Sequence, residues 1–256
     1  MAFPWYESFM RQLLKRVLRR LGYDIHKIRT HQPEMGDLPR EQIEIIDACR
    51  PFTLTSTERM AALCNVISYL TNARIPGDIA ECGVWRGGSM MIIARMLLAA
   101  GDVDRNLYLY DTFEGMSEPT KFDASLDGTS ARQQLDATER GTGVWCEASI
   151  EDVRRNLLST GYPEERIHLI KGKVEETLPA RNPGKLALLR LDTDWYESTL
   201  HELMHLYPLL QEKGILVIDD YGHWQGCRKA VDEFFEGQRV FLHRIDYTGR
   251  LLVKEA

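Results

Sequence analysis

The sequence predicts an α/β fold in which a mostly parallel sheet of seven strands carries helices on both faces. After Pro76-Gly77, short apolar segments alternate with segments of helical pattern. The apolar segments are compact, as strands buried on both faces of a parallel sheet are. The last two apolar segments flank a tight Tyr-Thr-Gly turn, which predicts an antiparallel hairpin at the end of the fold.

The N-terminal residues 1–30 predict a basic amphipathic helix. They hold seven Lys or Arg against two acids, a net charge of +5, which leaves −11 for the rest of a chain whose formal charge is −6. Apolar residues recur at helical spacing opposite these cations. Residues 9–29 could associate weakly with an anionic membrane surface or an acidic partner, or dock on their own domain or across a dimer. We favour docking, because basic amphipathic helices are common in soluble folds.

The next segment, residues 30–54, predicts a connector with a short helix at 40–49. A longer helix follows, and one of the hydroxyl residues at 55–57 can cap its N-terminus. We expect residues 1–50 to form an N-terminal helical extension. Residues 51–256 are expected to form the domain that contains the sheet.

The strands and helices of the sheet follow in order. The predicted strands span residues 78–82, 106–111, 166–170, 185–192, 214–220, 239–246 and 250–254. The predicted helices span residues 88–100, 149–160, 197–212 and 225–236. A long polar segment, residues 112–146, interrupts the alternation. Long loops in compact domains are often functional, so we expect a lid or substrate-binding insertion with a local helix near 131–138.

The composition narrows the range of functions. The 256 residues are 44% apolar and 27% charged, as in ordinary globular proteins, and the negative net charge argues against nucleic-acid binding. Five cysteines without Cys-x-x-Cys spacing argue against a disulfide framework and favour a reducing compartment, so we expect a cytoplasmic protein. The N-terminus lacks a signal-peptide pattern, and Arg95 interrupts the apolar run MMIIARMLLAA, so stable membrane insertion is not expected.

The first two strand tips predict a cofactor site, because open parallel sheets bind ligands at the carboxyl ends of their strands. The first tip reads ECGVWRGGS, from Glu81 to Ser89, and its glycines permit a tight turn before a helix. Glu81 would repel a pyrophosphate but would attract an ammonium, such as that of S-adenosylmethionine. The second tip ends at Asp111, which is placed to accept hydrogen bonds from ribose hydroxyls. Together the two tips indicate an adenosylmethionine-binding sheet.

The fourth and fifth strands predict a metal site. They end at Asp192 and at Asp219-Asp220, with Asp194 close by. In the usual topology of adenosylmethionine-dependent sheets these strands are neighbours, so their tips lie about 5 Å apart. Carboxylates this close repel each other, and a divalent cation would offset the repulsion. Oxygen donors favour Mg²⁺, Mn²⁺ or Ca²⁺ over Zn²⁺. The alternative is that Asp219 or Asp220 only caps the following turn.

Two other signatures lie close together in the stretch LDTDWYESTLHELMH. Asp192-Thr193-Asp194 matches the Asp-x-Asp of metal-dependent glycosyltransferases that use nucleotide-sugars. This is the main alternative function, although it leaves Glu81, Asp111 and Asp219-Asp220 unexplained.

The second signature, His201 to His205, spells the His-Glu-x-x-His of zinc proteases. The helix is expected to bury a stripe made of Leu200, Leu203, Met204, Tyr207 and Leu210. That stripe would leave both histidines on the flank or the exposed face, and no third ligand follows at the expected spacing. We therefore interpret this signature as coincidence.

Five segments together resemble a known family: GDIAECGVWRGGSM, LYDTFEGM, KGKVEETLP, LRLDTDWYEST and VIDDYGHWQGCRKAVDEFF. They resemble the macrocin O-methyltransferase family of antibiotic-sugar methyltransferases over about residues 50–240. The resemblance implies a class I, adenosylmethionine-dependent and Mg²⁺-dependent enzyme that methylates a deoxysugar hydroxyl on a glycosylated natural product. We therefore expect a small-molecule glycoside as substrate, no nucleic-acid partner and a homo-oligomer.

The resemblance also implies roles for single residues. Those implied to bind adenosylmethionine are Ser56, Glu81, Gly83, Trp85, Gly87, Ser89, Asp111, Thr112, Phe113 and Val174. Among them, the turn that begins at Glu81 would hold the methionine part, Asp111 the ribose and Val174 the adenine, with Ser56 near the sulfonium.

For the chemical step, the resemblance implies that Asp192, Asp219 and Asp220 hold the metal. Asp194 would be the general base. His223 is the alternative base, because it directly follows the metal ligands.

Overall fold

The computed structural model describes residues 35–140 and 143–255. The chain divides into two compact units, residues 1–37 and residues 38–256, and the fold described below is that of the second. The basic amphipathic helix predicted for residues 1–30 lies outside the described residues.

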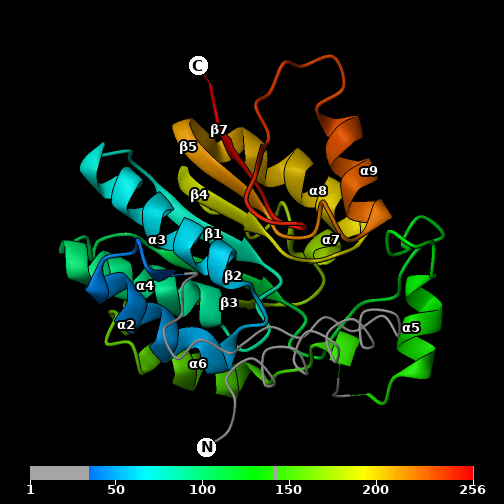
Figure 1. Cartoon of the computed structure of the whole chain (residues 1–256), viewed down its shortest axis with the longest axis horizontal. Helices are drawn as coiled ribbons and strands as arrows, with labels where there is room; N and C mark the ends of the chain where they lie inside the picture. Colours follow the sequence, from blue (N-terminus) through cyan, green and yellow to red (C-terminus); the bar gives the residue numbers. More distant parts are fainter. Residues whose placement is uncertain (1–34, 141–142, 256) are drawn as a thin grey trace, which may run out of the picture. The chain divides into compact units, whose positions relative to one another are not determined.

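A seven-stranded sheet organises the second unit, in the order β3-β2-β1-β4-β5-β7-β6 (Figure 1). Its strands are β1 (Asp78–Cys82), β2 (Leu107–Asp111), β3 (Ile167–Lys171), β4 (Leu186–Leu191), β5 (Leu210–Ile218), β6 (His243–Arg244) and β7 (Arg250–Val253). Strands β1 to β5 pair in parallel, whereas β7 pairs antiparallel with both β5 and β6. The predicted parallel sheet with an antiparallel terminal hairpin is therefore confirmed.

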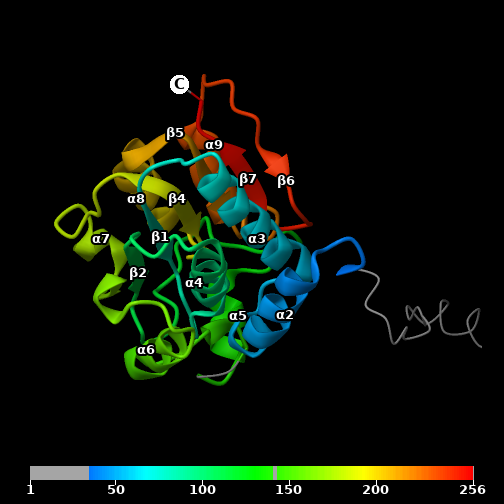
Figure 2. The same cartoon turned by 90° about the vertical axis from the view of Figure 1, so that its left-hand side faces the viewer.

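Helices cover both faces of the sheet, as predicted (Figures 1 and 2). One group packs together as α2 (Arg40–Cys49), α3 (Thr57–Asn72), α4 (Gly88–Ala100) and α6 (Ile150–Leu158). The other group consists of α7 (Val174–Thr177), α8 (Tyr196–Leu206) and α9 (Gln225–Phe234). Short 3-10 turns are η2 (Arg50–Phe52), η3 (Gly143–Trp145), η4 (Glu164–Arg166) and η5 (Tyr207–Leu209). Because α2 packs on α4, it belongs to the same compact unit as the sheet.

The centre of the core is β4, whose six residues are all buried. A strand covered by helices on both faces reads as a continuous apolar run, and LALLRL follows that rule except at Arg190. The Arg190 side chain is only 1% exposed. The strand thus carries a buried cation next to its carboxyl end.

Two elements differ in length from their predictions. The helix predicted over 197–212 ends at Leu206, because Pro208 has no N–H to continue it, and β5 already begins at Leu210. The strand predicted over 239–246 is reduced to the two residues of β6, since only these pair with β7.

The buried face of α8 also differs from the predicted stripe. The residues that it buries are Ser198, Thr199, Glu202, Leu203 and Leu206. Met204 is 57% exposed, so its assignment to the core was wrong. The early end of the helix takes Tyr207 and Leu210 out of helical phase. Trp195, which precedes α8, is also buried.

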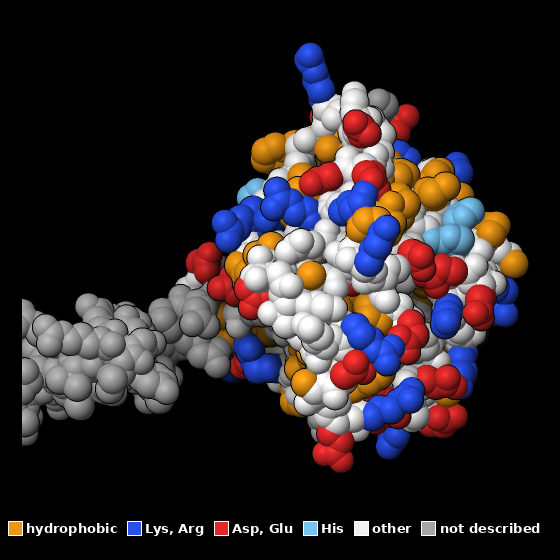
Figure 3. Space-filling view, turned by 90° about the vertical axis from the view of Figure 1, so that its right-hand side faces the viewer, with side chains coloured by type: hydrophobic (Ala, Val, Ile, Leu, Met, Phe, Trp, Pro, Cys, Tyr) orange, Lys and Arg blue, Asp and Glu red, His pale blue; other side chains and the backbone are white. Residues whose placement is uncertain are grey.

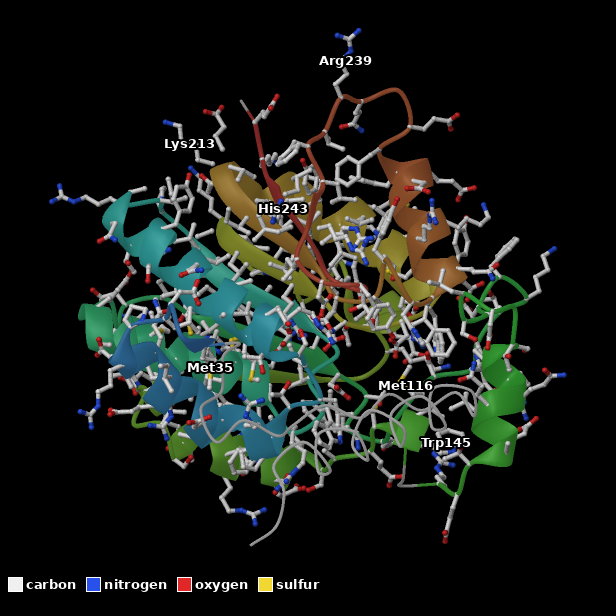
Figure 4. All side chains as sticks on the ribbon, viewed as in Figure 1. Met35, Met116, Trp145, Lys213, Arg239 and His243 are labelled. Carbon is white, nitrogen blue, oxygen red and sulfur yellow. The ribbon has the colours of Figure 1, made fainter. Side chains whose placement is uncertain are left out.

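The insertion at 112–146 contains α5 (Ala131–Ala137), in agreement with the predicted local helix. Its two ends meet at Met116 and Trp145, which are labelled in Figure 4, where the N–H of Met116 donates to the carbonyl of Trp145 at 3.1 Å. Both side chains pack against the core of the sheet. On the side of the molecule that carries α5 and α9, cationic and anionic side chains are interspersed (Figure 3).

The middle of the insertion docks on the N-termini of α8 and α9. Asp123 is 1% exposed, and its Oδ1 accepts a hydrogen bond from the N–H of Tyr196 at 2.8 Å. The N–H of Gln225 donates to the carbonyl of Ala124 at 2.8 Å. A side chain at Gly226 would overlap the Asp123 carboxylate, so glycine is needed for this close approach. The insertion is thus anchored beside the carboxyl ends of the strands.

Candidate functional site

A cavity of about 530 Å³ lies at the carboxyl ends of β1, β2, β4 and β5. The strand order reverses between β1 and β4, and open sheets bind ligands at such a point. The predicted site residues that line the cavity are Gly83, Trp85, Ser89, Asp111, Thr112, Val174, Asp192, Asp194, Asp219, Asp220 and His223. The glycine-rich turn after β1 and the acids after β4 and β5, which are far apart in the sequence, therefore share one cavity. Its volume suits a small-molecule site.

Four predicted cofactor residues lie behind the cavity wall: Ser56, Glu81, Gly87 and Phe113. The Ser56 hydroxyl caps α3 by accepting from the N–H of Arg59 at 3.2 Å, and it donates to Asp246 at 2.6 Å. Glu81 is buried and pairs with Arg190 at 2.5 Å, while its Oε2 has no hydrogen-bond partner in the described part of the chain. Their contact with a cofactor stays a prediction.

Asp111 braces the glycine-rich turn that follows β1. Its Oδ2 accepts from the N–H groups of Val84 at 2.7 Å and Trp85 at 3.3 Å, and its Oδ1 accepts from that of Phe113 at 2.7 Å. Burial raises the pKa of Asp111, and these backbone hydrogen bonds counteract the rise. Gly83 has a φ of 78°, and a side chain there would collide with the carbonyl of Asp192. The turn is thereby packed directly against the tip of β4.

Asp192, Asp219 and Asp220 form a carboxylate cluster, as predicted. One carboxylate oxygen of each residue lies within 4.8 Å of the corresponding oxygens of the other two. In the described ranges, this is the one group of three or more His, Cys, Asp or Glu side chains that could hold a metal ion. Asp192 follows β4 while Asp219 and Asp220 follow β5, and β4 and β5 are adjacent parallel strands. The register of two neighbouring strands therefore creates the cluster.

Two arginines that the sequence analysis did not identify partly neutralise the cluster. Arg190 reaches Glu81 at 2.5 Å, Asp192 at 2.8 Å and Asp219 at 2.6 Å. Burial lowers the pKa of Arg190, but the carboxylates around it outweigh that effect and raise its pKa above the usual value. From α3, Arg59 pairs with the other oxygen of Asp219. The signal in the sequence was an arginine inside an apolar strand, LALLRL.

The carboxyls of the site nevertheless outnumber these two guanidinium groups. Burial raises the pKa of Asp194 to about 6, and the Asp219 charge adds to that rise. Burial also raises the pKa values of Asp192 and Asp220 well above the usual range. The Asp194 and Asp220 carboxyls interact with each other, which lowers the pKa of Asp194 and adds to the rise of the Asp220 pKa. Asp194 has a φ of 65°, an unfavourable backbone conformation that aims its side chain into the cluster.

His223 lies on the other side of the cluster. Its N–H donates to the carbonyl of Asp220 at 2.9 Å, and its Nδ1 is 2.9 Å from the hydroxyl of Tyr247 in the terminal hairpin. Burial lowers its pKa, so the ring is neutral at pH 7 and can accept a proton. Geometry thus keeps His223 as the second candidate base, behind Asp194.

The His-Glu-x-x-His segment does not form a metal site. The His201 and His205 rings pack against each other at 4.3 Å on the flank of α8. Glu202 points away from them into the core, where it is fully buried. Because Glu202 points away from the two neighbouring histidines, the segment lacks the arrangement of a zinc-protease site, and the interpretation of this signature as coincidence agrees with the structure.

Comparison with known proteins points to one group of enzymes. Residues 10–254 match the family model described as Macrocin-O-methyltransferase (TylF). The chain is 34% identical to the 8-demethyl-8-(2,3-dimethoxy-alpha-L-rhamnosyl)-tetracenomycin-C 4'-O-methyltransferase of Streptomyces olivaceus. That alignment spans 182 residues, which are 71% of this chain and 67% of the relative. It is also 33% identical to the mycinamicin III 3''-O-methyltransferase of Micromonospora griseorubida. That alignment spans 183 residues, which are 71% of this chain and 69% of the relative.

Solved structures agree with this similarity. The structure of the O-methyltransferase NovP matches with a TM-score of 0.70 and 28% identity, over 97% of this chain and 99% of that chain. The calicheamicin methyltransferase CalS11 matches with a TM-score of 0.59 and 18% identity, over 90% and 98% respectively, which supports the fold alone. The expected class I methyltransferase fold is therefore confirmed, and the glycosyltransferase alternative finds no support among these relatives.

Proposed function

Because this chain belongs to the macrocin O-methyltransferase family and is an adenosylmethionine-dependent O-methyltransferase, we propose that it methylates a sugar hydroxyl of a glycosylated natural product with the help of a divalent cation. The observation that carries the proposal is the single cavity in which the glycine-rich turn and the carboxylate cluster face each other. Relatives whose names specify rhamnosyl and macrolide substrates support a glycoside acceptor.

The cofactor would occupy the part of the cavity beside β1 and β2. Trp85, Ser89 and Asp111 line that part, together with Val174 at the start of α7. The Asp111 carboxylate, which lines the cavity, suits ribose hydroxyls, and the N-terminus of α4 suits the carboxylate of the methionine moiety. When bound, adenosylmethionine supplies a sulfonium methyl that is already activated for transfer.

Asp194 would remove the proton from the sugar hydroxyl. Its raised pKa makes it a stronger base than an exposed carboxylate while leaving it ionised at pH 7. The proton would move from the hydroxyl to Asp194 as the oxygen–methyl bond forms and the sulfur–methyl bond breaks. The walls of the cavity would align the two reactants, and such alignment contributes much of the rate in reactions with an activated donor.

A divalent cation fits the residues that are present. Among the described residues, five carboxyls, those of Glu81, Asp192, Asp194, Asp219 and Asp220, lie together with two guanidinium groups, those of Arg59 and Arg190. This excess of carboxyls, together with oxygen-only donors, suits Mg²⁺. Asp192, Asp219 and Asp220 would hold the ion, which would lower the pKa of a bound hydroxyl.

The decisive experiment is a screen of glycosides with methyl-labelled adenosylmethionine, with and without EDTA. Label should appear on a sugar, and EDTA should abolish it while added Mg²⁺ restores it. Activity that is unaffected by EDTA would remove the metal from the proposal. Calorimetry with adenosylhomocysteine and with a nucleotide-sugar tests the cofactor separately, since only adenosylhomocysteine should bind.

Three broader proposals accompany this function. Residues 51–256 form the methyltransferase domain, with an N-terminal extension at 1–50 whose helix α2 packs on α4 of that domain. The protein is a homo-oligomer, and it acts in the cytoplasm without a nucleic-acid partner. Within the described ranges, no helix has the length and apolar character needed to cross a membrane. Light scattering of the purified full chain measures the oligomeric state directly.

A further inference from the structure

Glu202 is a fully buried carboxyl that the proposed chemistry does not use. It lies on the inner face of α8, its side chain is 0% exposed, and its Oε1 has no hydrogen-bond partner among the residues that the structure describes. Burial raises its pKa well above the usual range. An aliphatic side chain would fill this position without the cost of burying a carboxyl. The carboxyl therefore needs an explanation other than packing.

The contact that distinguishes Glu202 is with the turn between the proposed metal ligand and the proposed base. The Thr193 hydroxyl donates to Glu202 Oε2 at 3.1 Å. Thr193 is the middle residue of Asp192-Thr193-Asp194 and lines the cavity. Glu202 thus contacts the Asp192-Thr193-Asp194 turn from the buried core.

This turn needs external support. Asp194 has a φ of 65°, which non-glycine residues rarely adopt without constraints from their surroundings. The backbone is held before the turn by the Asp192 N–H, which donates to Cys82 at 2.8 Å. After the turn, the Trp195 Nε1 donates to the carbonyl of Ser117 at 3.0 Å. The Thr193–Glu202 hydrogen bond fixes the segment between these two anchors.

We propose that Glu202 is a positioning residue, which holds the Asp192-Thr193-Asp194 turn in its reactive geometry through the hydroxyl of Thr193. For its effect on catalysis, this inference rests on the proposed methyltransferase function. It assigns a role to the central Glu of the His-Glu-x-x-His segment that is unrelated to zinc.

The test compares five variants of the full-length protein: two at Glu202, a control at Thr199, Thr193→Val, and Thr193→Val combined with Glu202→Leu. Glu202→Leu has a similar size and removes the hydrogen bond, whereas Glu202→Gln keeps an acceptor for Thr193. Thr199→Val is the matched control, because Thr199 is a buried hydroxyl on the same face of α8, and its side chain bonds to Cys227 rather than to the turn. Two properties are measured: amide hydrogen exchange in the peptide 191–196, and kcat with the glycoside that the wild type methylates fastest.

In Glu202→Leu we expect faster exchange in the peptide and a kcat lower by about tenfold to a hundredfold, the size of effect that small misplacements of reacting groups produce. The KM for adenosylmethionine should stay within about threefold, because the cofactor half of the cavity is untouched. Glu202→Gln should recover most of both properties, and Thr199→Val should match the wild type. Thr193→Val should reproduce Glu202→Leu, and combining the two should add little.

Unchanged exchange in Glu202→Leu would overturn the inference, as would an equal response in Thr199→Val or an unchanged kcat in a variant whose turn exchanges faster. If the wild type methylates no glycoside, the proposed function fails by itself. The exchange measurement still decides whether Glu202 holds the turn.

Discussion

At the scale of single residues, the site depends on how buried charges are balanced. Arg190 contacts Glu81, Asp192 and Asp219 while its side chain is only 1% exposed. Removing one partner of a buried ion pair leaves the remaining charges uncompensated, which costs far more than losing an exposed pair. Arg190 therefore supports the fold as well as the site.

Replacing Arg190 with Met tests this conclusion. We expect Arg190→Met to lower the free energy of unfolding by about 3–5 kcal/mol, measured by urea denaturation. Arg154→Met is the control, because Arg154 pairs with Glu164 at 3.4 Å on the surface, and its loss should cost less than about 1 kcal/mol. Similar losses in the two variants would contradict the role of Arg190.

Asp194 is the residue on which the proposed proton transfer depends. Asp194→Asn should lower kcat by about 10²–10⁴-fold, the usual contribution of a general base. Binding of adenosylhomocysteine, measured by calorimetry, should change little. His223→Asn provides the comparison. The variant with the larger loss of kcat should be the one that lacks the general base. Near-normal turnover in Asp194→Asn would reject its assignment.

The sequence predicted the acids of the site because each follows the end of an apolar strand. Asp111, Asp192 and Asp219-Asp220 all follow that rule. It could not predict Arg59 or Glu202, whose roles depend on which helix face meets which strand tip. Helical phase is a tertiary property, and the face that α8 buries differs from the predicted stripe, with Met204 exposed.

At the scale of elements, the parallel strands were predictable because burial on both faces leaves unbroken apolar runs. The ends of α8 and β6 were harder to predict from the sequence. The end of α8 depends on a proline, and the extent of β6 depends on its pairing with β7. The insertion at 112–146 was recognised by its length and polarity. Its attachment to α8 and α9 through Asp123 has no local sequence pattern.

Gly226→Ala should detach the insertion. The new methyl group would overlap the Asp123 carboxylate, which bonds to the start of α8. Alanine favours helices by about 0.5–1 kcal/mol over glycine, so lower stability would reflect the clash. We expect faster proteolysis within 117–130 and lower turnover. Gly184→Ala is the control, because a side chain there meets no atom within 4 Å. An intact insertion in Gly226→Ala would contradict this anchoring.

At the scale of the whole molecule, the buried carboxyls couple folding to pH. Burial raises the pKa of Glu81 to about 7 and that of Asp194 to about 6, and it raises those of Asp192, Asp220 and Glu202 as well. The folded chain therefore holds protons that the unfolded chain, with carboxyl pKa values near about 4, has released. Stability must then rise as the pH falls through these folded pKa values.

In EDTA, we expect the melting temperature to rise by on the order of 2–4 °C between pH 8 and pH 6.5, as measured by calorimetry. Burial lowers the pKa values of His205 and His223, so below about pH 6.5 these residues oppose the trend. Mg²⁺ at pH 8 should restore the lost stability by binding the ionised cluster. A melting temperature that falls between pH 8 and pH 6.5 in EDTA would contradict this account.

The pairing of Arg59 with Asp246 at 3.0 Å has a consequence for biosynthesis. Arg59 leaves the ribosome early, but Asp246 and the hairpin strand that covers the edge of β5 leave it late. Until then a nascent chain exposes the edge of β5, and Arg59 lacks one of its anchors. A translation product that stops before Asp246 would carry every proposed catalytic residue but would lack this partner of Arg59 and the strand that pairs with β5. Completing the hairpin therefore completes both the sheet and the support of the site.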